Sequence, residues 1–460
     1  MNKIFYLLTI FLIISNRTAP EWVDTSSGIF GSGEKIREED KIGGKKVFDD
    51  IEIYEKEINK SLKIRLKNNF KTNSFVNNLT NNNGLINFER KLNKVSRYKF
   101  KKKKKLKKVS KYKFKKISQF EFSQPELLIT NKDSLIFFNN RGTILNFDQK
   151  SKILWKKNVY AKKERKNNPI LYFAANDKIL VVTDNFAKYY GINLTNGELL
   201  WSNTNSSPFN SQVKIYKNKF FAVDSENILR CFSLENGKEM WNFKTENSFI
   251  KSQQKLSLII NNNRVVFINT LGDVSSIDIN NGKLFWQTPT QSSEIYENSF
   301  SLQNSDLIVA KKGIFFSNNK NQFFALNEKT GAIEWKQNIN SSLRPTYVQG
   351  LIFTISLEGY LAVIDARNGN LVRMTNIFGK MRNFEQKGLI ADKKFIKPVG
   401  FIVSKDKIYT SLNNGKMIII DILTGKPIEI VKIDNEKISR PYIFNNEMFV
   451  IRDNAILKLN

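Results

Sequence analysis

Seven segments of the chain share one pattern, and this internal repeat limits the fold more than any other feature of the sequence. The pattern is apolar–Asp/Asn–x–x–Asn/Thr–Gly–x–x–x–Trp, with small departures, and successive last positions lie 38 to 56 residues apart. Repeats of roughly 20–50 residues are typical of solenoids and propellers, whose units bury their faces only by stacking. The segments are Leu145–Trp155, Gly191–Trp201, Cys231–Trp241, Ser276–Trp286, Ala325–Trp335, Val363–Arg373 and Ile419–Glu429.

Each repeat has the length and the turn signals of four short strands. An apolar run such as Ile179–Thr183, Val265–Ile268 or Ile352–Ile355 precedes a polar turn, a second strand and the Asp-x-x-Asn/Thr-Gly turn. Asp or Asn opens a type I turn through its side chain, and Gly takes the following left-handed position. Four short strands in about 45 residues make one propeller blade, so the repeat predicts a ring of blades.

A tryptophan ends the pattern in five of the repeats. A single Trp can stack on a sugar or a planar cofactor, but five at one repeat position indicate a structural role between adjacent blades. We therefore expect these side chains to pack against the next blade, and they are Trp155, Trp201, Trp241, Trp286 and Trp335.

An eighth blade is expected to be completed by a strand from elsewhere in the chain. Met448–Asn460 matches the two inner strands of a further repeat but lacks its Gly turn and outer strand. Closure by the two ends protects edges that would otherwise be exposed. The sequence thus predicts an all-β fold: an eight-bladed β-propeller of four-stranded antiparallel blades, closed by an N-terminal strand.

The donor of that strand is expected in a basic run before the first blade. Residues 90–116 carry sixteen Lys or Arg and no acidic residue, and within them Lys94–Lys102 recurs as Lys108–Lys116. Each copy alternates in the period of a half-buried strand. One hypothesis is an arm that binds phosphates; the other, which we favour, is an edge strand whose lysines discourage edge-to-edge pairing. The sequence does not decide which copy closes the ring.

The N-terminal residues predict export. A positively charged start is followed by the apolar run Ile4–Ile14, which is the length of a signal-peptide core and too short to span a bilayer. No Cys follows this run, so we expect no lipidation. The expected organisation is a signal peptide at 1–19, a polar, extended or partly disordered arm at 20–85, a basic segment with the closing strand at 86–118, and the propeller at 119–460.

Composition excludes several classes of chemistry. The chain has no histidine and one cysteine, Cys231. It therefore has no Ser-His-Asp or Cys-His apparatus, no histidine metal ligand, no zinc cluster and no intramolecular disulfide. We expect no enzyme activity, no cofactor and no metal. The formal net charge of +31 favours an anionic partner, although a compositional bias toward Lys, Asn, Ile and Phe accounts for it equally well.

The repeat resembles the pyrroloquinoline-quinone-type propeller repeat, and the eight blades, export signal and closing strand together resemble the BamB family. This resemblance covers about residues 120–460. It implies a non-enzymatic periplasmic scaffold at the inner face of the outer membrane, within the β-barrel assembly machinery. The implied partner is the barrel component BamA, through its POTRA domains. Such a protein is a monomer within a hetero-complex.

The resemblance also implies two docking loops on one rim of the propeller. The first follows Trp241 and contains the apolar-basic pair Ile250 and Lys251. The second follows Trp286 and contains Glu294, Tyr296 and Glu297. Ordinary loop polarity is the alternative interpretation of all five residues.

Two other functions remain open at this stage. A quinone-dependent dehydrogenase on the same fold would need clustered carboxylates for calcium and usually a vicinal Cys pair, and the single Cys argues against it. A binder of anionic polymers would use the basic arm. We expect residues 90–116 to contact an anionic membrane surface at most, and we expect no nucleic-acid partner.

Overall fold

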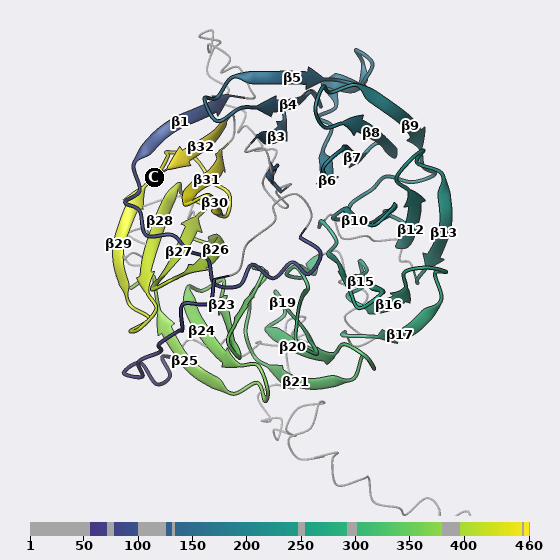
Figure 1. Ribbon diagram of the computed structural model, residues 1–460. Coiled ribbons are helices and arrows are strands. Elements are labelled where there is room, and N and C mark those ends of the chain that lie inside the picture. The colour runs from purple at the N-terminus through teal and green to yellow at the C-terminus, as the bar shows by residue number, and fades with distance from the viewer. Residues whose placement is uncertain are drawn as a thin grey trace, which may run out of the picture. The chain divides into compact units, whose positions relative to one another are not determined.

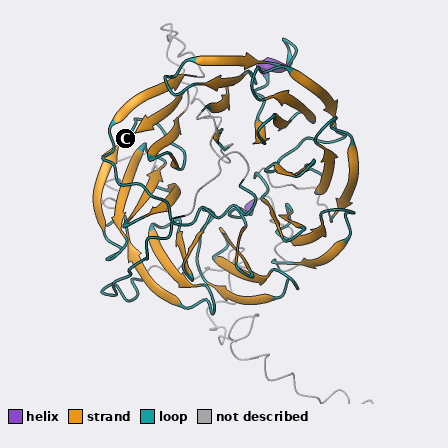
Figure 2. Ribbon diagram, in the orientation of Figure 1, coloured by secondary structure: helices purple, strands orange, loops and turns teal. Residues whose placement is uncertain are grey.

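A computed structural model shows eight four-stranded antiparallel sheets arranged as the blades of a propeller ring (Figure 1). The all-β fold class and the eight blades predicted from the repeat are therefore confirmed. Strands dominate the ribbon (Figure 2), and η2 is one turn of 3-10 helix at Glu164–Lys166. The structure describes residues 56–70, 78–99, 126–130, 134–246, 254–291, 301–379, 396–452 and 455–459.

Each of the first seven blades is formed by four consecutive strands, in chain order from the centre of the ring outward. Blades 1 and 2 comprise β2 (Leu128–Ile129), β3 (Leu135–Phe138), β4 (Ile144–Phe147) and β5 (Ile153–Lys157), then β6 (Leu171–Ala175), β7 (Ile179–Asp184), β8 (Lys188–Asn193) and β9 (Leu199–Thr204). Blades 3 and 4 comprise β10 (Lys214–Tyr216), β11 (Lys219–Val223), β12 (Ile228–Ser233) and β13 (Glu239–Lys244), then β14 (Leu258–Asn261), β15 (Arg264–Ile268), β16 (Val274–Asp278) and β17 (Leu284–Thr288).

The remaining blades continue this order until the last one. Blades 5 and 6 comprise β18 (Ile308–Ala310), β19 (Gly313–Asn318), β20 (Gln322–Asn327) and β21 (Ile333–Gln337), then β22 (Thr346–Val348), β23 (Leu351–Ile355), β24 (Tyr360–Asp365) and β25 (Leu371–Asn376). Blade 7 comprises β26 (Pro398–Ser404), β27 (Lys407–Leu412), β28 (Lys416–Asp421) and β29 (Pro427–Lys432), and blade 8 comprises β30 (Tyr442–Phe444), β31 (Glu447–Arg452), β32 (Ala455–Leu459) and β1 (Lys94–Lys99).

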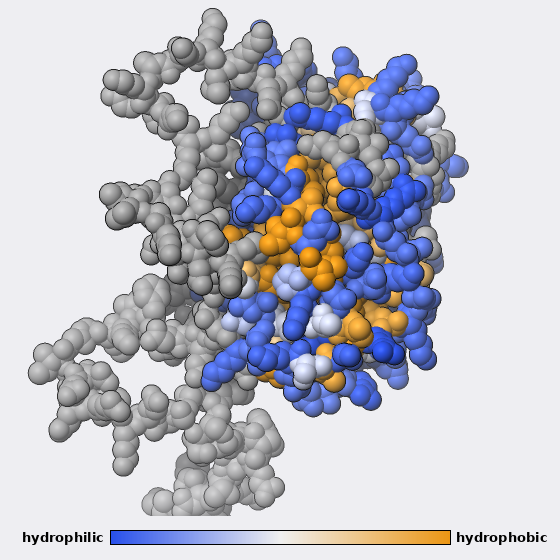
Figure 3. All heavy atoms as spheres, turned by 90° about the vertical axis from the view of Figure 1, so that its left-hand side faces the viewer, coloured by the Kyte–Doolittle hydropathy of each residue, from blue (hydrophilic) through white to orange (hydrophobic). Residues whose placement is uncertain are grey.

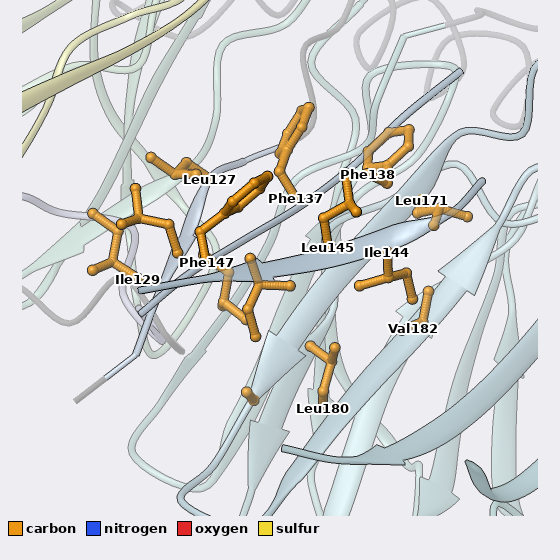
Figure 4. Close-up of a cluster of buried hydrophobic side chains, with 14 of the residues drawn as sticks. Leu127, Ile129, Phe137, Phe138, Ile144, Leu145, Phe147, Leu171, Leu180 and Val182 are labelled. Atoms are coloured by element: carbon orange, nitrogen blue, oxygen red, sulfur yellow. The ribbon is translucent and has the colours of Figure 1, made fainter. Parts of the chain in front are cut away.

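The apolar runs of the repeat form the middle strands of the blades. Five of the six residues of β7 are buried, whereas β9 at the outer edge alternates between exposed and half-buried residues. Strands that are buried on both faces read as continuous apolar runs. Side chains of neighbouring blades meet in a shared core, as Phe138 and Ile144 of blade 1 do with Val182 of blade 2 (Figure 4).

The Gly and the Trp of the repeat meet across each of five blade boundaries. The indole of one blade covers the glycine in the last turn of the next, so a Cβ atom at Gly331 would lie 2.5 Å from Cδ2 of Trp286. In four of these pairs the indole N–H also donates to a carbonyl oxygen of the next blade. These bonds run from Trp155 to Leu194 (3.1 Å), and from Trp201 to Leu234, Trp286 to Glu328 and Trp335 to Ala366 (3.2 Å each).

Glycine is required at the repeat position for two separate reasons, which a comparison of Gly331 with Gly350, a glycine outside the repeat pattern, makes clear. At Gly331 φ is +74°, in the region that L side chains rarely adopt, and the space above its Cα is filled by Trp286. Gly350 also has a positive φ, +88°, but a Cβ atom there would meet nothing within 4 Å. Only the first glycine is therefore needed for close packing as well as for the turn.

An arginine replaces the tryptophan at the boundary between blades 6 and 7. The side chain of Arg373 is fully buried, and it donates to the carbonyl oxygens of Ile422 and Leu423, both at 2.7 Å. It also donates to the carbonyl oxygen of Leu62 at 3.1 Å. The planar guanidinium lies beside Gly425, as the indole does elsewhere. Arg373 thus closes this boundary with hydrogen bonds and ties residue 62 to it.

The first copy of the duplicated basic segment is the outer strand of the last blade. β1 pairs antiparallel with β32, with Arg97 opposite Leu457 and Lys99 opposite Ala455. In Figure 1 it lies on the outer circumference of the ring, beside β32. The second copy, Lys108–Lys116, lies outside the described residues. The expected donor strand is therefore found at Lys94–Lys99.

Part of the polar region expected to form an arm is packed into the propeller. Ile64 and Leu85 join the core between blades 6 and 7, and Ile86 and Phe88 join the core between blades 7 and 8. In Figure 1 residues 56–70 lie beside β25, and the chain from residue 78 runs from the centre of the ring out toward β1. The sequence pattern did not reveal this because the anchors are single apolar residues in an irregular segment. The expected signal peptide, residues 1–19, lies outside the described residues.

The glycine–tryptophan contact predicts unequal effects of one substitution. Gly331→Ala should lower the free energy of unfolding by about 3 kcal/mol, because the left-handed φ and the overlap with Trp286 both oppose a Cβ atom. Gly350→Ala should lower it by only about 1–2 kcal/mol, since it has the φ but no overlap. Chemical denaturation measures both. In a Trp286→Ala background the two losses should become similar; equal losses in the wild-type background would contradict the packing role.

The pairing of β1 predicts which copy of the basic segment matters. Of two neighbouring residues in a strand, one directs its N–H toward the partner strand, so Ser96→Pro with Arg97→Pro must remove a ladder hydrogen bond to β32. We expect the free energy of unfolding to fall by on the order of 2 kcal/mol. The matched control is Ser110→Pro with Lys111→Pro, at the same positions of the second copy, which should have no effect. The reverse result would assign the outer strand to the second copy.

Candidate docking face and axial charged ring

The five docking residues expected from the sequence lie outside the described residues. Ile250 and Lys251 fall in 247–253, and Glu294, Tyr296 and Glu297 fall in 292–300. The stems of both loops are described, and they locate the rim to which the loops belong. The first loop joins blade 3 to blade 4, and the second joins blade 4 to blade 5.

A reciprocal amide pair ties the ends of the two loops together. The side-chain Nε2 of Gln254 donates to the carbonyl oxygen of Asn304, and the backbone N–H of Asn304 donates to Oε1 of Gln254 at 2.6 Å. Gln254 is the first described residue after one loop, and Asn304 lies shortly after the other. The two loops therefore end side by side on one rim.

Turns at the same end of blades 3 and 4 are also joined across the blade boundary. Asn227 in blade 3 donates from Nδ2 to the hydroxyl of Thr270 in blade 4 at 2.9 Å, and its Oδ1 accepts from the Thr270 N–H at 3.1 Å. Asn227 Nδ2 also donates to the carbonyl oxygen of Glu246, at the start of the first loop, at 2.9 Å. Asn227 therefore joins the β11–β12 turn of blade 3 to the β15–β16 turn of blade 4 and to the described stem of the first loop.

Six charged side chains meet at the centre of the propeller, and we call them the axial ring. Each lies within three residues of the start of the innermost strand of its blade. The blades stand around one centre (Figure 1), so this one repeat position is brought together from six blades. The axial ring comprises Glu126, Lys214, Lys255, Asp306, Arg344 and Arg440.

Glu126 is shared by most of the cations in the axial ring. Its Oε1 contacts Nη2 of Arg344, and it lies 3.4 Å from Nη2 of Arg440 and 3.6 Å from Nζ of Lys255. Gln212 donates to the same oxygen at 3.3 Å. Arg344 also donates from Nε to Asp306 Oδ2 at 2.7 Å. One carboxylate oxygen thus connects blades 1, 3, 4, 6 and 8.

The electrostatics of the axial ring keep both carboxylates ionised. Burial opposes the charged form of Glu126, but Arg344, Arg440 and Lys255 hold its pKa well below the usual value. Burial likewise opposes ionisation of Asp306, and Arg344 and Lys255 lower its pKa. Lys214 behaves differently, because burial lowers the pKa of its ammonium to about 7 in spite of the nearby carboxylates.

Residues 78–83 complete the polar surroundings of Lys214. Its Nζ donates to the carbonyl oxygen of Asn78, and to Oδ1 of Asn81 at 2.7 Å. Asn81 is fully buried and donates in turn to Gln212 at 2.9 Å and to the carbonyl oxygen of Leu307 at 3.0 Å. The N-terminal segment therefore satisfies buried groups of several inner strands at once.

The axial ring and the stems of the two loops belong to the same end of the blades. Lys255 directly follows Gln254, whose side chain bonds Asn304, and Asp306 lies two residues after Asn304. The loop stems thus lead straight into the ring. The sequence contains a sign of this ring, because a charged residue recurs just before the first strand of several repeats, at Glu126, Lys255, Asp306 and Arg440.

The outer strands present a different kind of surface. Ile428 and Ile430 of β29 are 56% and 46% exposed, and apolar side chains reach the surface among hydrophilic ones on the side that carries β29 and β1 (Figure 3). At β25 the chain covers this edge itself, since Ile58 and Met374 exchange two backbone hydrogen bonds of 2.9 Å. Nothing comparable is seen on β29 within the described ranges.

The described residues place limits on two further interpretations. Among them, no helix is long and apolar enough to cross a membrane. Within the same ranges, no three acidic or thiol side chains are grouped so that they could hold a metal ion.

Comparison with curated proteins gives two partial matches. One is the outer membrane protein assembly factor BamB of Legionella pneumophila, 24% identical over 127 residues, which are 26% of this chain and 29% of that protein. The other is an uncharacterized protein of Rickettsia conorii, 23% identical over 211 residues, 41% of this chain and 48% of that protein. The chain thus spans less than half the length of the curated relatives it matches.

Comparison with solved structures shows the fold. The crystal structure of BamB from Moraxella catarrhalis has a TM-score of 0.57 and 13% identity, covering 74% of this chain and 99% of that one. The designed protein Ika8 has a TM-score of 0.54 and 13% identity, covering 72% and 94%. The family model described as outer membrane protein assembly factor BamB matches residues 140–375, slightly more than half of the 460 residues. On this match, together with the eight-bladed architecture, the chain belongs to the BamB family.

Proposed function

We propose that this protein is a non-enzymatic scaffold of the outer-membrane β-barrel assembly machinery, which docks on POTRA domains of a BamA-like barrel component. The observation that carries the proposal is the Gln254–Asn304 pair, which fixes the ends of two neighbouring rim loops side by side. Family membership supports the assembly role. Loops on a rigid rim are free to vary in sequence while the blades are committed to the core.

The two loops offer the chemistry of a docking surface. Ile250 with Lys251 is an apolar residue beside a cation, and Tyr296 lies in sequence between acidic residues, Glu294 before it and Glu297 after it. Apolar or aromatic anchors surrounded by charge are what interface hot spots tend to be. A POTRA-type domain can also add a strand beside such loops.

The lack of histidine and the burial of the single cysteine support a scaffold rather than an enzyme. The chain has no histidine, and its single thiol, Cys231, is fully buried in β12. Burial raises the pKa of this thiol to about 12, so it is not a thiolate nucleophile at neutral pH. These properties suit a protein that acts by binding.

We place the protein in the periplasm, at the inner face of the outer membrane. Residues 1–19 are proposed as its export signal, and no Cys is available there for lipidation. The basic residues 90–116 are proposed to contact anionic lipid head groups at most, because part of them, β1, is already committed to blade 8.

The docking proposal predicts a specific loss of binding. Ile250→Asp with Lys251→Glu should weaken capture of a BamA-like POTRA fragment by about 30- to 900-fold, which corresponds to roughly 2–4 kcal/mol for hot-spot residues. The melting temperature should not change, since in the sequence both residues lie between the end of β13 and the start of β14. Surface plasmon resonance with the immobilised fragment measures the affinity.

Two controls make the result specific. Lys238→Glu reverses a charge at the exposed turn of blade 3, at the opposite end of its outer strand, and should leave capture unchanged. Deleting residues 20–55, which precede the packed segment, should also preserve it. If that deletion abolishes capture while the double variant binds normally, the docking site lies in the N-terminal region and not on this rim.

A further inference from the structure

We propose that the axial ring is a binding site for carboxylate ligands, in which Arg344, Lys255 and Arg440 receive the ligand at the position now held by Glu126. The inference is independent of the docking function, since it concerns the centre of the propeller and a ligand of defined charge. The carboxylate belongs either to an acidic peptide segment or to a small polycarboxylate, since both carry the group that the ring recognises.

The charge balance of the axial ring favours an added anion. It contains four cations, Lys214, Lys255, Arg344 and Arg440, against the two carboxylates of Glu126 and Asp306. Charges removed from water are stable only when they are paired and hydrogen-bonded. Among the described residues of the ring, one positive charge is therefore left without a counter-charge when Lys214 is neutral, and two are left when it is protonated.

The geometry shows that these cations already recognise a carboxylate. Lys255 and Arg440 approach Glu126 only to 3.6 and 3.4 Å, which is longer than a normal N–H···O hydrogen bond. Among the described residues, Glu126 is the one carboxylate within 4 Å of the Lys255 ammonium, while the more distant Lys255 charge also lowers the pKa of Asp306. Arg440 also makes a side-chain hydrogen bond with Tyr442, but a guanidinium has five donors and an ammonium three, so both cations can donate to further oxygens.

Exposure indicates the direction from which a ligand arrives. The Glu126 side chain is 31% exposed, whereas the side chains of Arg344, Lys255 and Arg440 are 6%, 10% and 16% exposed. Glu126 is thus the most exposed side chain of the four, and the three cations are the more deeply buried partners. An incoming carboxylate reaches them beside Glu126 or in its place.

Lys214 links this binding to pH. Its ammonium faces Glu126, Asp306, Arg344 and Lys255, and its pKa is about 7. An added anion stabilises the charged form of a neighbouring lysine, so binding near neutral pH is coupled to proton uptake. Lowering the pH from 8 to 6 protonates Lys214 and should strengthen binding of a ligand that stays fully ionised over this range.

The test is isothermal titration of the full chain with two carboxylate probes. A capped tri-aspartate peptide represents the acidic segment and citrate represents the small polycarboxylate; a tri-asparagine peptide and matched sodium chloride are the neutral and ionic-strength controls. We expect saturable binding of at least one carboxylate probe, with tri-aspartate binding at least several-fold tighter at pH 6 than at pH 8 if it is the ligand. Whichever probe binds identifies the source.

Variants separate the axial ring from the general positive field of the protein. Glu126→Gln removes the resident charge and should increase affinity about tenfold, while Lys255→Met with Arg440→Met should decrease it at least tenfold. The matched control, Lys238→Met with Lys283→Met, removes the same charge at two exposed turns and should leave affinity unchanged. Lys255→Gln alone, with a weaker loss in the same direction, serves if the double variant does not fold.

Two results would overturn the proposal. No saturable binding of either probe to the folded wild-type chain would show that the axial ring only ties the blades together. An equal loss of affinity in the axial and the exposed-lysine variants would show that the probes respond to net charge alone.

Discussion

The contact between a glycine in one blade and the aromatic ring of the preceding blade is the interaction on which the rest of this structure depends. It requires a residue without a Cβ atom at a left-handed turn, and it brings an indole N–H within reach of the next carbonyl oxygen. The same contact recurs at five boundaries, from blade 1 through blade 6, and joins each of these blades to the next. Where Arg373 takes the place of Trp, the guanidinium makes the same connection with hydrogen bonds to carbonyl oxygens.

Regular stacking of this kind has a consequence at the centre of the ring. Any repeat position near the start of an innermost strand is brought close to its counterparts in the other blades, so residues such as Glu126 and Arg344, 218 positions apart, become direct partners. Their charges strongly influence one another because they are removed from water. The axial ring is thus a product of the architecture and not of any local motif, and its excess of cations makes it a candidate receptor for carboxylates.

The N-terminal segment is the second element that the ring depends on. It supplies Asn81 to the buried groups of the inner strands, Phe88 to the core between blades 7 and 8, and β1 to the last sheet. Residues 78–99 form one continuous segment. It contacts the inner strands at Asn81 and ends as β1, the outer strand of blade 8. Blades 3 to 5, whose connections contain the proposed docking residues, therefore belong to a ring that both ends of the chain close.

The sequence by itself determined the fold class, the number of blades and the presence of a donor strand, because strand length, turn chemistry and the Gly–Trp pattern are local properties repeated many times. It also identified Trp286 and its equivalents as contacts between blades. Only the tertiary structure decided that Lys94–Lys99 is the donor, that Ile64 and Phe88 are core residues, and that six separate charges form one ring. The two copies of the basic segment are nearly identical, so their pattern cannot show which one pairs with β32. Each charge of the axial ring has no partner within its own repeat. Its contacts exist only because the closed ring brings distant segments together.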